Sequence, residues 1–266
     1  MILSSGAKYN QINFSKNHVS GNARKIGVTV IWWFTDDQIY YQALQTLLDA
    51  INKEKPDAVL FNWKSISEAG IVHEGIHPIK TEIITSGREL YLQEYINMAP
   101  WCYIYKRGFL MEKQIEFPID FKTCEDIQFN QKALFFASKV LALPIVGYLY
   151  RDMNVSATKG REHRVAQDQI RRLESEINYF SAYNDSQFLF EIVYRNLREI
   201  NVWLAKCNPD EEMYIAIKNI LRTYRLPFAF SYKSLLIIMM TTVPKLACKM
   251  QEMVHRIRLV VYYRKY

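Results

Sequence analysis

The sequence has 266 residues, half of them hydrophobic, with 18 tyrosines and 14 phenylalanines. This excludes a disordered chain and allows one large domain or a domain with an appendage. The net charge is +7, but residues 231–266 carry seven basic residues against one acid, so the rest of the chain is close to neutral. A nucleic-acid-binding protein usually distributes basic residues over its body, and we therefore expect no nucleic-acid partner.

The first half of the sequence alternates between strand and helix patterns. The β-branched and aromatic segment 28–34 predicts a buried strand. Apolar residues at helical spacing then predict a helix over 38–52. A second strand is expected over 58–63, and residues 71–84 are expected to be extended with turns.

This alternation continues to about residue 150. We expect a helix over 88–97, a strand over 101–105 that leads into a short helix, a helix over 125–140 and a strand over 145–150. Strands that alternate with helices are typical of α/β proteins. The sequence therefore predicts an α/β domain over residues 1–158.

Residues 159–266 show only helical patterns. We expect helices within 161–206, 210–224 and 232–263, separated where prolines occur. The chain is therefore predicted to continue from its α/β domain into an α-helical C-terminal region.

Cysteine use and hydropathy favour a cytoplasmic protein. The four cysteines form no Cys-x-x-Cys pair, so we expect reduced thiols and no structural zinc. The N-terminus contains too few apolar residues for a signal peptide. The longest apolar run near the C-terminus, 235–240, is far shorter than the ~20 residues that span a bilayer. We expect contact with the inner face of the cytoplasmic membrane to be peripheral at most.

Two adjacent carboxylates, Glu125 and Asp126, open the helix expected over 125–140. One carboxylate of such a pair can hold and polarise the other, so a general base is one interpretation. A capping box is the alternative, because Thr123 and Asp126 have the Ser/Thr-x-x-Asp/Glu spacing of that motif. Both interpretations can be correct, because a capped helix start holds a general base in a fixed position.

A second acidic pair, Asp36 and Asp37, follows the strand expected over 28–34. Ligands of α/β sheets bind at strand ends of this kind. Carboxylate oxygens suit Mg²⁺ or Mn²⁺, so the pair is a candidate metal site. The alternative is that these residues cap the helix expected to begin at Gln38.

Four segments follow a recognisable order. Residues 17–27 are similar to the motif N-x-G-(V/L)-S-x-A-R-N-x-G, and residues 33–37 to an F-x-D-x-D-D cluster. Residues 101–110 are similar to W-x-x-(I/L)-Y-(K/R)-R-x-(F/L)-(I/L). The fourth segment has two parts. Residues 117–126 are similar to F-P-x…x-E-D-x-x-F, and residues 148–156 are similar to Y-x-Y-R…S. Together they resemble the family 2 glycosyltransferases, inverting enzymes that build bacterial capsule, lipopolysaccharide and exopolysaccharide chains. The resemblance implies a GT-A-like, Rossmann-like mixed sheet.

This resemblance also implies a reaction. A sugar would move from a nucleotide-diphospho-sugar donor to a glycan or lipid-linked acceptor. A divalent cation, Mg²⁺ or Mn²⁺, held by Asp36 and Asp37 would neutralise the departing diphosphate. Asp126 would deprotonate the acceptor hydroxyl, and Glu125 would orient the substrate.

Three further residues match positions of the family motifs that would contact the donor. Arg24 is implied to contact phosphate, Trp101 to stack on a sugar ring and Arg151 to pair with diphosphate oxygens. The residues themselves leave alternatives open. A lone arginine in a loop, such as Arg24, is usually solvated. Trp101 is one aromatic residue among many, and such residues more often belong to the core. For Arg151 the alternative is a structural salt bridge.

The chain departs from the family in two places. Family members begin with strands that hold the nucleotide base, and only residues 5–12 match the end of that region. The stretch from Gly27 to Asp37 is also too short, so that either Phe34 replaces the first acid or two residues are lost after Asp36. We therefore expect an N-terminally incomplete glycosyltransferase whose activity could be impaired.

The C-terminal segment 245–266 has an amphipathic pattern. Apolar residues recur at helical spacing, most basic residues lie off that line, and tyrosines provide aromatic anchors. The pattern is typical of an interfacial helix attracted to anionic lipid. A final helix packed on the domain is the alternative. The first interpretation would suit a lipid-linked acceptor, or a non-catalytic remnant that binds a membrane or a partner.

Overall fold

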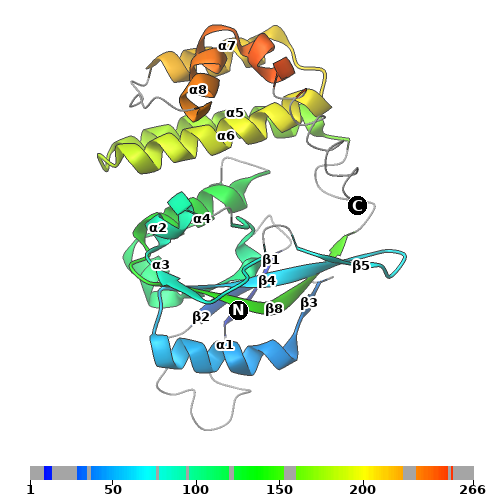
Figure 1. Ribbon diagram of the computed structural model, residues 1–266, viewed down its shortest axis with the longest axis vertical. Coiled ribbons are helices and arrows are strands. Elements are labelled where there is room, and N and C mark those ends of the chain that lie inside the picture. Colours follow the sequence, from blue (N-terminus) through cyan, green and yellow to red (C-terminus); the bar gives the residue numbers. More distant parts are fainter. Residues whose placement is uncertain are drawn as a thin grey trace. The chain divides into compact units, whose positions relative to one another are not determined.

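The computed structural model describes residues 9–13, 29–34, 37–75, 78–93, 96–119, 123–152, 160–223, 232–250 and 253 (Figure 1). The chain divides into two compact units. The sheet unit comprises Met1–Pro118 and Glu125–Val155, and the helical unit comprises Ile119–Cys124 and Ser156–Tyr266. Residues 119–124 therefore belong with the C-terminal helices, although they precede the helix at Glu125 in the sequence.

The described residues of the sheet unit form an eight-stranded mixed sheet. Its strands are β1 (Tyr9–Asn13), β2 (Thr29–Phe34), β3 (Gln38–Ile39), β4 (Ala58–Ser67), β5 (Val72–Glu74), β6 (Ile83–Thr85), β7 (Tyr103–Lys106) and β8 (Val140–Asp152). The main order is β1-β2-β7-β4-β8-β3, while β5 pairs with β4 and β6 with β8. Only β4 and β8 run parallel to each other among the described strands. The mixed sheet expected from the sequence is confirmed.

The core of the sheet lies where β4 and β8 begin. Residues 58–61 and 140–143 are buried apolar runs, as is usual for parallel strands covered on both faces. The register between the two strands shifts around Asn62. Gly147 packs there against the ring of Phe61, and a Cβ atom on Gly147 would lie 2.5 Å from that ring. Beyond this shift, polar and aromatic side chains replace the apolar run.

The helices of the sheet unit are α1 (Tyr41–Glu54), α2 (Gly87–Gln93), η2 (Pro100–Cys102), α3 (Arg107–Glu112) and α4 (Glu125–Phe136). The helix expected to start at Gln38 starts at Tyr41 instead. Gln38 and Ile39 pair with β8, and the backbone N–H of Tyr40 donates to the Gly147 carbonyl over 3.0 Å. These bonds hold residues 38–40 in an extended conformation.

Helix α4 is shorter than the helix expected over 125–140. The carboxylate of Asp57 accepts hydrogen bonds from the backbone N–H of Ser138 at 2.9 Å and from its hydroxyl at 2.6 Å. It also accepts the backbone N–H of Lys139 at 3.2 Å. These bonds turn the chain away from the helix, so that Val140 enters β8 beside β4.

The helical unit contains four long helices, α5 (Glu162–Ser181), α6 (Ser186–Lys206), α7 (Glu211–Thr223) and α8 (Tyr232–Thr242), and residues 244–250 are also helical. The run expected over 161–206 is therefore two helices. Asn184 has a left-handed backbone with φ 54°, and Asp185 caps α6 by accepting the Phe188 N–H over 3.0 Å. The expected helical C-terminal region is confirmed, and its apolar faces form one core.

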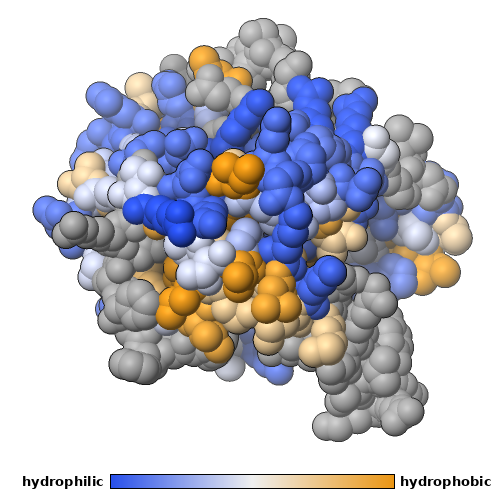
Figure 2. All heavy atoms as spheres, turned by 90° about the horizontal axis from the view of Figure 1, so that it is seen from above, coloured by the Kyte–Doolittle hydropathy of each residue, from blue (hydrophilic) through white to orange (hydrophobic). Residues whose placement is uncertain are grey.

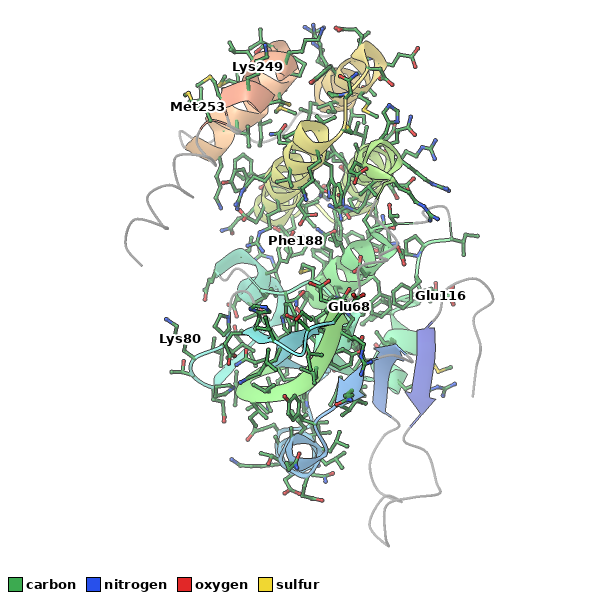
Figure 3. The ribbon with its side chains drawn as sticks, turned by 90° about the vertical axis from the view of Figure 1, so that its right-hand side faces the viewer. Glu68, Lys80, Glu116, Phe188, Lys249 and Met253 are labelled. Atoms are coloured by element: carbon green, nitrogen blue, oxygen red, sulfur yellow. The ribbon has the colours of Figure 1, made fainter. Side chains whose placement is uncertain are left out.

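The surface visible in Figure 2 is mostly hydrophilic, with separate apolar patches. The helical unit exposes several large apolar side chains near its C-terminal end, namely Leu235, Val243, Leu246, Met250 and Met253. Lys249 and Met253 are labelled together on the last described helical turns in Figure 3. None of the described helices is both long and apolar enough to cross a membrane.

Candidate active site

Helix α4 begins directly with the acidic pair, as the sequence predicts. Glu125 and Asp126 are both half-buried. Cys124 before them has a left-handed backbone with φ 63°, which costs a non-glycine residue about 1–2 kcal/mol. The Thr123 hydroxyl donates to Asp168 Oδ2 over 2.9 Å within the helical unit. The chain therefore enters α4 through a constrained turn.

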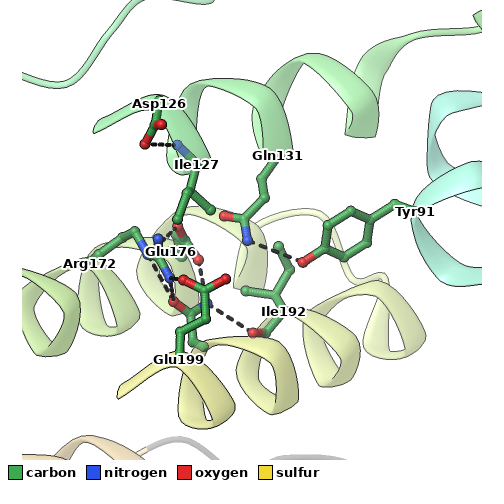
Figure 4. A network of polar contacts seen from close by, with 9 residues as sticks. Tyr91, Asp126, Ile127, Gln131, Arg172, Glu176, Ile192 and Glu199 are labelled. Atoms are coloured by element: carbon green, nitrogen blue, oxygen red, sulfur yellow. Dashed lines mark hydrogen bonds and ion pairs between the residues drawn. The ribbon is translucent and has the colours of Figure 1, made fainter. Parts of the chain in front are cut away.

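The first turn of α4 stabilises negative charge. Asp126 Oδ1 accepts the backbone N–H of Ile127 at 2.8 Å (Figure 4). The first N–H groups of a helix have no acceptor within the helix, and the helix dipole favours acidic side chains there. Asp126 therefore occupies a position at the helix terminus that suits a carboxylate, and its function as a general base stays a prediction.

Polar side chains in the middle of α4 bind this helix to other elements of the sheet unit. Asn130 is fully buried; its Oδ1 accepts the Tyr105 hydroxyl at 2.6 Å, and its Nδ2 donates to the Met98 carbonyl. Gln131 Nε2 donates to the Tyr91 hydroxyl at 3.1 Å (Figure 4). Since Asp126 and Asn130 are four residues apart, they share one face of the helix. The candidate base is thus one turn from a well-anchored residue.

Asp37 is a buried carboxylate with a structural function. Its Oδ2 accepts the Tyr148 hydroxyl at 2.7 Å, and its Oδ1 accepts the backbone N–H of Arg151 at 2.6 Å. Both partners lie on β8, so Asp37 attaches the chain before β3 to the end of that strand. The interpretation that Asp37 caps a helix is wrong, because α1 starts at Tyr41 and its N-cap, Tyr40, makes no side-chain cap bond.

Trp101 lies in an aromatic cluster at the same end of the sheet. Its ring is 8% exposed and stacks on Tyr148 with centroids 4.8 Å apart, and on Tyr150 at 5.5 Å. Trp63 from β4 meets it edge to face at 5.0 Å. These contacts agree with the alternative that Trp101 is a core residue. Its stacking on a sugar ring stays a prediction. The short helix η2 that carries Trp101 also contacts α4, β4 and β8.

Arg151 is exposed at the end of β8, and none of the ion pairs among the described residues involves its guanidinium group. Its backbone, bonded to Asp37, brings two of the predicted site residues together. Arg24 and Asp36 lie outside the described residues.

The metal site predicted at Asp36 and Asp37 depends on a residue that is not described. Within the described ranges no group of three or more metal-binding side chains occurs. Asp37 already accepts two hydrogen bonds, so a cation would have to share its oxygens with Tyr148 and Arg151. Carboxylate oxygens suit a divalent cation in their chemistry, and the metal site at Asp36 and Asp37 stays a prediction.

Three residues of this region were not among the predicted site residues, although Tyr148 begins the segment 148–156 that matches a family motif. Tyr148 holds Asp37, Asn130 anchors α4 and Trp63 completes the aromatic cluster. Asn130 had a detectable signal, because it is a polar residue on the buried face of a helix with apolar neighbours. The partners of Tyr148 and Trp63 are distant in the sequence and leave no local pattern.

No protein-family model matches the sequence, and no curated protein matches it. Solved structures do match. Residues 1–349 of S. aureus TarS in complex with UDP-GlcNAc align with a TM-score of 0.63 and 16% identity, covering 86% of this chain and 67% of that chain.

Two other structures of the same TarS segment agree. TarS 1–349 alone gives a TM-score of 0.61 at 16% identity, and the complex with UDP gives 0.60 at 18% identity. Each alignment covers 86% of this chain and 66% of the TarS chain, so the chain spans about two thirds of their length. The mixed sheet followed by helices that the sequence predicts is the fold of these TarS structures.

Proposed function

We propose that this chain is a glycosyltransferase that uses a nucleotide-diphospho-sugar donor and a glycan or lipid-linked acceptor. The observation that carries the proposal is its fold, shared with TarS structures that hold UDP-GlcNAc and UDP. The acidic pair at the start of α4 supports it, since Asp126 is mounted on a helix anchored to the sheet through Asn130.

In the proposed reaction, Asp126 accepts the proton of an acceptor hydroxyl while that oxygen attacks the anomeric carbon of the donor sugar. The bond between the anomeric carbon and the diphosphate breaks, and the nucleoside diphosphate leaves. Attack opposite the leaving group inverts the anomeric centre. Glu125 positions the acceptor. Arg151, which is exposed, binds diphosphate oxygens, and we assign the same function to Arg24.

A divalent cation is part of this proposal, with Asp36 and Asp37 as its protein ligands. Such an ion neutralises charge on the departing diphosphate. We expect EDTA to suppress the release of nucleoside diphosphate and Mn²⁺ or Mg²⁺ to restore it. Unchanged activity in EDTA would remove the cation from the proposal and leave the sugar transfer in place.

The first experiment measures nucleoside diphosphate released from a panel of nucleotide sugars by the full chain. Asp126→Asn removes the proton acceptor at nearly constant shape, and we expect a loss of about 10²–10⁴-fold in kcat. Asp49→Asn, on the exposed face of α1, is the matched control and should retain full activity. Absence of both turnover and nucleotide binding in the folded chain would refute the proposal.

A second candidate function is a non-catalytic remnant that binds an anionic membrane through its C-terminal helices. Exposed Val243, Leu246, Met250 and Met253 follow each other at intervals of three and four residues, as on one helix face. Lys249 lies among them, while Lys245 pairs with Glu211. The basic excess of residues 231–266 would favour anionic lipid over a second copy of the same chain.

Liposome sedimentation tests this second candidate. We expect binding to vesicles that contain phosphatidylglycerol, weaker binding at high salt and none after deletion of residues 245–266. Neutral phosphatidylcholine vesicles are the control. Equal binding to both vesicle types would contradict an electrostatic membrane contact.

A further inference from the structure

The chain around the start of α4 is held by hydrogen bonds in both units. In the middle of the helix, Asn130 Oδ1 accepts the Tyr105 hydroxyl at 2.6 Å, and Tyr105 lies on β7 of the sheet unit. Just before the helix, the Thr123 hydroxyl donates to Asp168 Oδ2 at 2.9 Å, and both residues belong to the helical unit. The acidic pair at the start of α4 therefore lies, along the chain, between two fixed points.

Asp168 is well fixed within the helical unit. It lies on α5 and is 4% exposed. Ala166 and Ile170 of the same helix belong to the packed core of this unit, and that core resists displacement of α5. Arg171 Nη1 is 3.9 Å from Asp168 Oδ1, but its side chain is mostly exposed, so water screens this ion pair. The bond from Thr123 is shorter, and a carboxylate strengthens the bond that it accepts.

The residue between Thr123 and Glu125 has a strained backbone. Cys124 has φ 63°, a left-handed conformation that residues with a Cβ atom rarely adopt. Such a conformation persists only where the surrounding structure holds it. Helix α4 holds it on one side, and the bond from Thr123 to Asp168 holds it on the other. This bond therefore keeps Cys124 in the conformation from which α4 starts.

Relaxation of this strain would act on the first turn of α4. Glu125 follows Cys124 directly, and Asp126 Oδ1 accepts the Ile127 N–H at 2.8 Å within that turn (Figure 4). The bond from Tyr105 to Asn130 would keep the rest of the helix in place. A change at Cys124 would therefore move the acidic pair and leave the remainder of α4 where it is.

We propose that Asp168 is a positioning residue for the acidic pair. Through Thr123 it fixes the first turn of α4, and thereby the direction in which Asp126 presents its carboxylate to an acceptor hydroxyl. The inference rests on the proposed glycosyltransferase function and adds a residue of the helical unit to those on which the reaction depends. A reacting group that is misplaced by about 1 Å can lower a rate by about 10²-fold, so a distant hydrogen bond can have a large effect on turnover.

The first test separates the chemical step from donor binding. Thr123→Val removes the hydroxyl at nearly constant shape, and we expect kcat to fall about 10–100-fold while the KM of the nucleotide sugar changes less than about twofold. Thr123→Ser keeps a hydroxyl and should retain most of the turnover. Thr241→Val, which removes a hydroxyl bonded to the Ile237 carbonyl in α8, is the matched control and should leave kcat unchanged.

The second test does not depend on turnover. In the ¹⁵N-labelled full chain, the Ile127 amide reports on the first turn of α4, because it donates to Asp126. The amide of Leu134, which is fully buried further along α4, reports on the rest of the helix. We expect Thr123→Val to speed hydrogen exchange at Ile127 about fivefold to thirtyfold and to leave Leu134 unchanged. A general loss of stability would instead speed both.

A double-variant cycle tests whether Thr123 and Asp168 act through one bond. Asp168→Ala removes the acceptor and should lower kcat and speed exchange at Ile127, as Thr123→Val does. The variant with both changes should be no worse than Asp168→Ala alone, because each change removes the same bond. Additive losses in kcat would mean that the two residues act separately, and would overturn the proposal.

The remaining outcomes separate this inference from the proposed function. If the unchanged chain turns over nucleotide sugars, but either kcat or exchange at Ile127 is unaffected in Thr123→Val, the positioning role is wrong and the transferase stands. If Ile127 and Leu134 exchange faster by the same factor, the bond supports the fold in general and the inference is wrong. If the unchanged chain shows no turnover but exchange rises at Ile127 alone, the bond positions the acidic pair and the assigned reaction is wrong.

Discussion

The two units of the chain bury polar side chains for different purposes. In the sheet unit, the buried Asp37 and the half-buried Asp57 accept backbone N–H groups from residues far away in the sequence. In the helical unit, Arg172 and Glu176 form a buried ion pair within α5, 3.3 Å apart, and Asn196 of α6 binds both side chains (Figure 4). Asp37 and Asp57 thus shape the backbone of the sheet unit, whereas Arg172, Glu176 and Asn196 join two helices through bonds between side chains.

The largest expected effect comes from breaking the pair in the helical unit. Glu176→Ala removes the buried carboxylate and leaves Arg172 with Asn196 and the partly exposed Glu199, 3.4 Å away, so we expect the free energy of unfolding to fall by about 3 kcal/mol. Urea unfolding followed by circular dichroism measures this change. A loss below about 1 kcal/mol would mean that the pair does not join α5 and α6 as described.

A triple variant sharpens the same point. Arg172→Met and Glu176→Leu together with Asn196→Leu remove both charges and the buried amide that binds them, and keep apolar volume between α5 and α6. We expect most of the stability lost in Glu176→Ala to return, because desolvation of the two charges is no longer required. Stability as low as that of the single variant would show that the charges themselves stabilise the helical unit.

A smaller effect is expected from Asp37 in the sheet unit. Asp37→Ala leaves the Tyr148 hydroxyl and the Arg151 N–H without this acceptor, and we expect a loss of about 2–3 kcal/mol in unfolding free energy. Tyr148→Phe removes one of the two bonds and should cost about 1 kcal/mol. Asp152→Ala, exposed at the end of the same strand, is the control and should be neutral.

The smallest effect concerns a half-buried pair of the sheet unit. The hydrogen bond and charge of Lys139, 2.7 Å from Glu54, lower the pKa of Glu54 below its ordinary value of 4.5. A lowered carboxyl pKa stabilises the fold above pH 4.5, and this stability is lost as the pH falls through the folded-state pKa. Titration of Glu54 by NMR should show its pKa returning toward 4.5 in Lys139→Gln, while an unchanged pKa would exclude Lys139 as the cause.

Apolar periodicity was enough to predict most elements, and the errors share one cause. The strand at 28–34, the start of α4 at Glu125 and the helical C-terminal region follow from local patterns. The misplaced boundaries lie near Asp37, Asp57 and Asp185, where a carboxylate binds a backbone N–H. Asp37 and Asp57 act across 114 and 81 residues, and no local pattern contains such a contact.

Asp185 is different because its bond is local. An aspartate three residues before the N–H that it binds is a common start of a helix, so the break in the expected run over 161–206 could have been predicted. The candidate site shows the same limit. The acidic residues were visible in the sequence, but the contacts of Trp101 with Trp63 and Tyr148 join residues that are far apart in the chain.

The path of residues 119–124 has a consequence for any shortened version of the protein. No single cut of the polypeptide separates the two units, because this stretch belongs to the helical unit yet precedes α4. A fragment that stops at residue 155 would keep Thr123 but lose Asp168, its hydrogen-bond partner. The residues that lead directly into Glu125 and Asp126 would then lack their anchor, so deletion of the helices would also disturb the acidic pair.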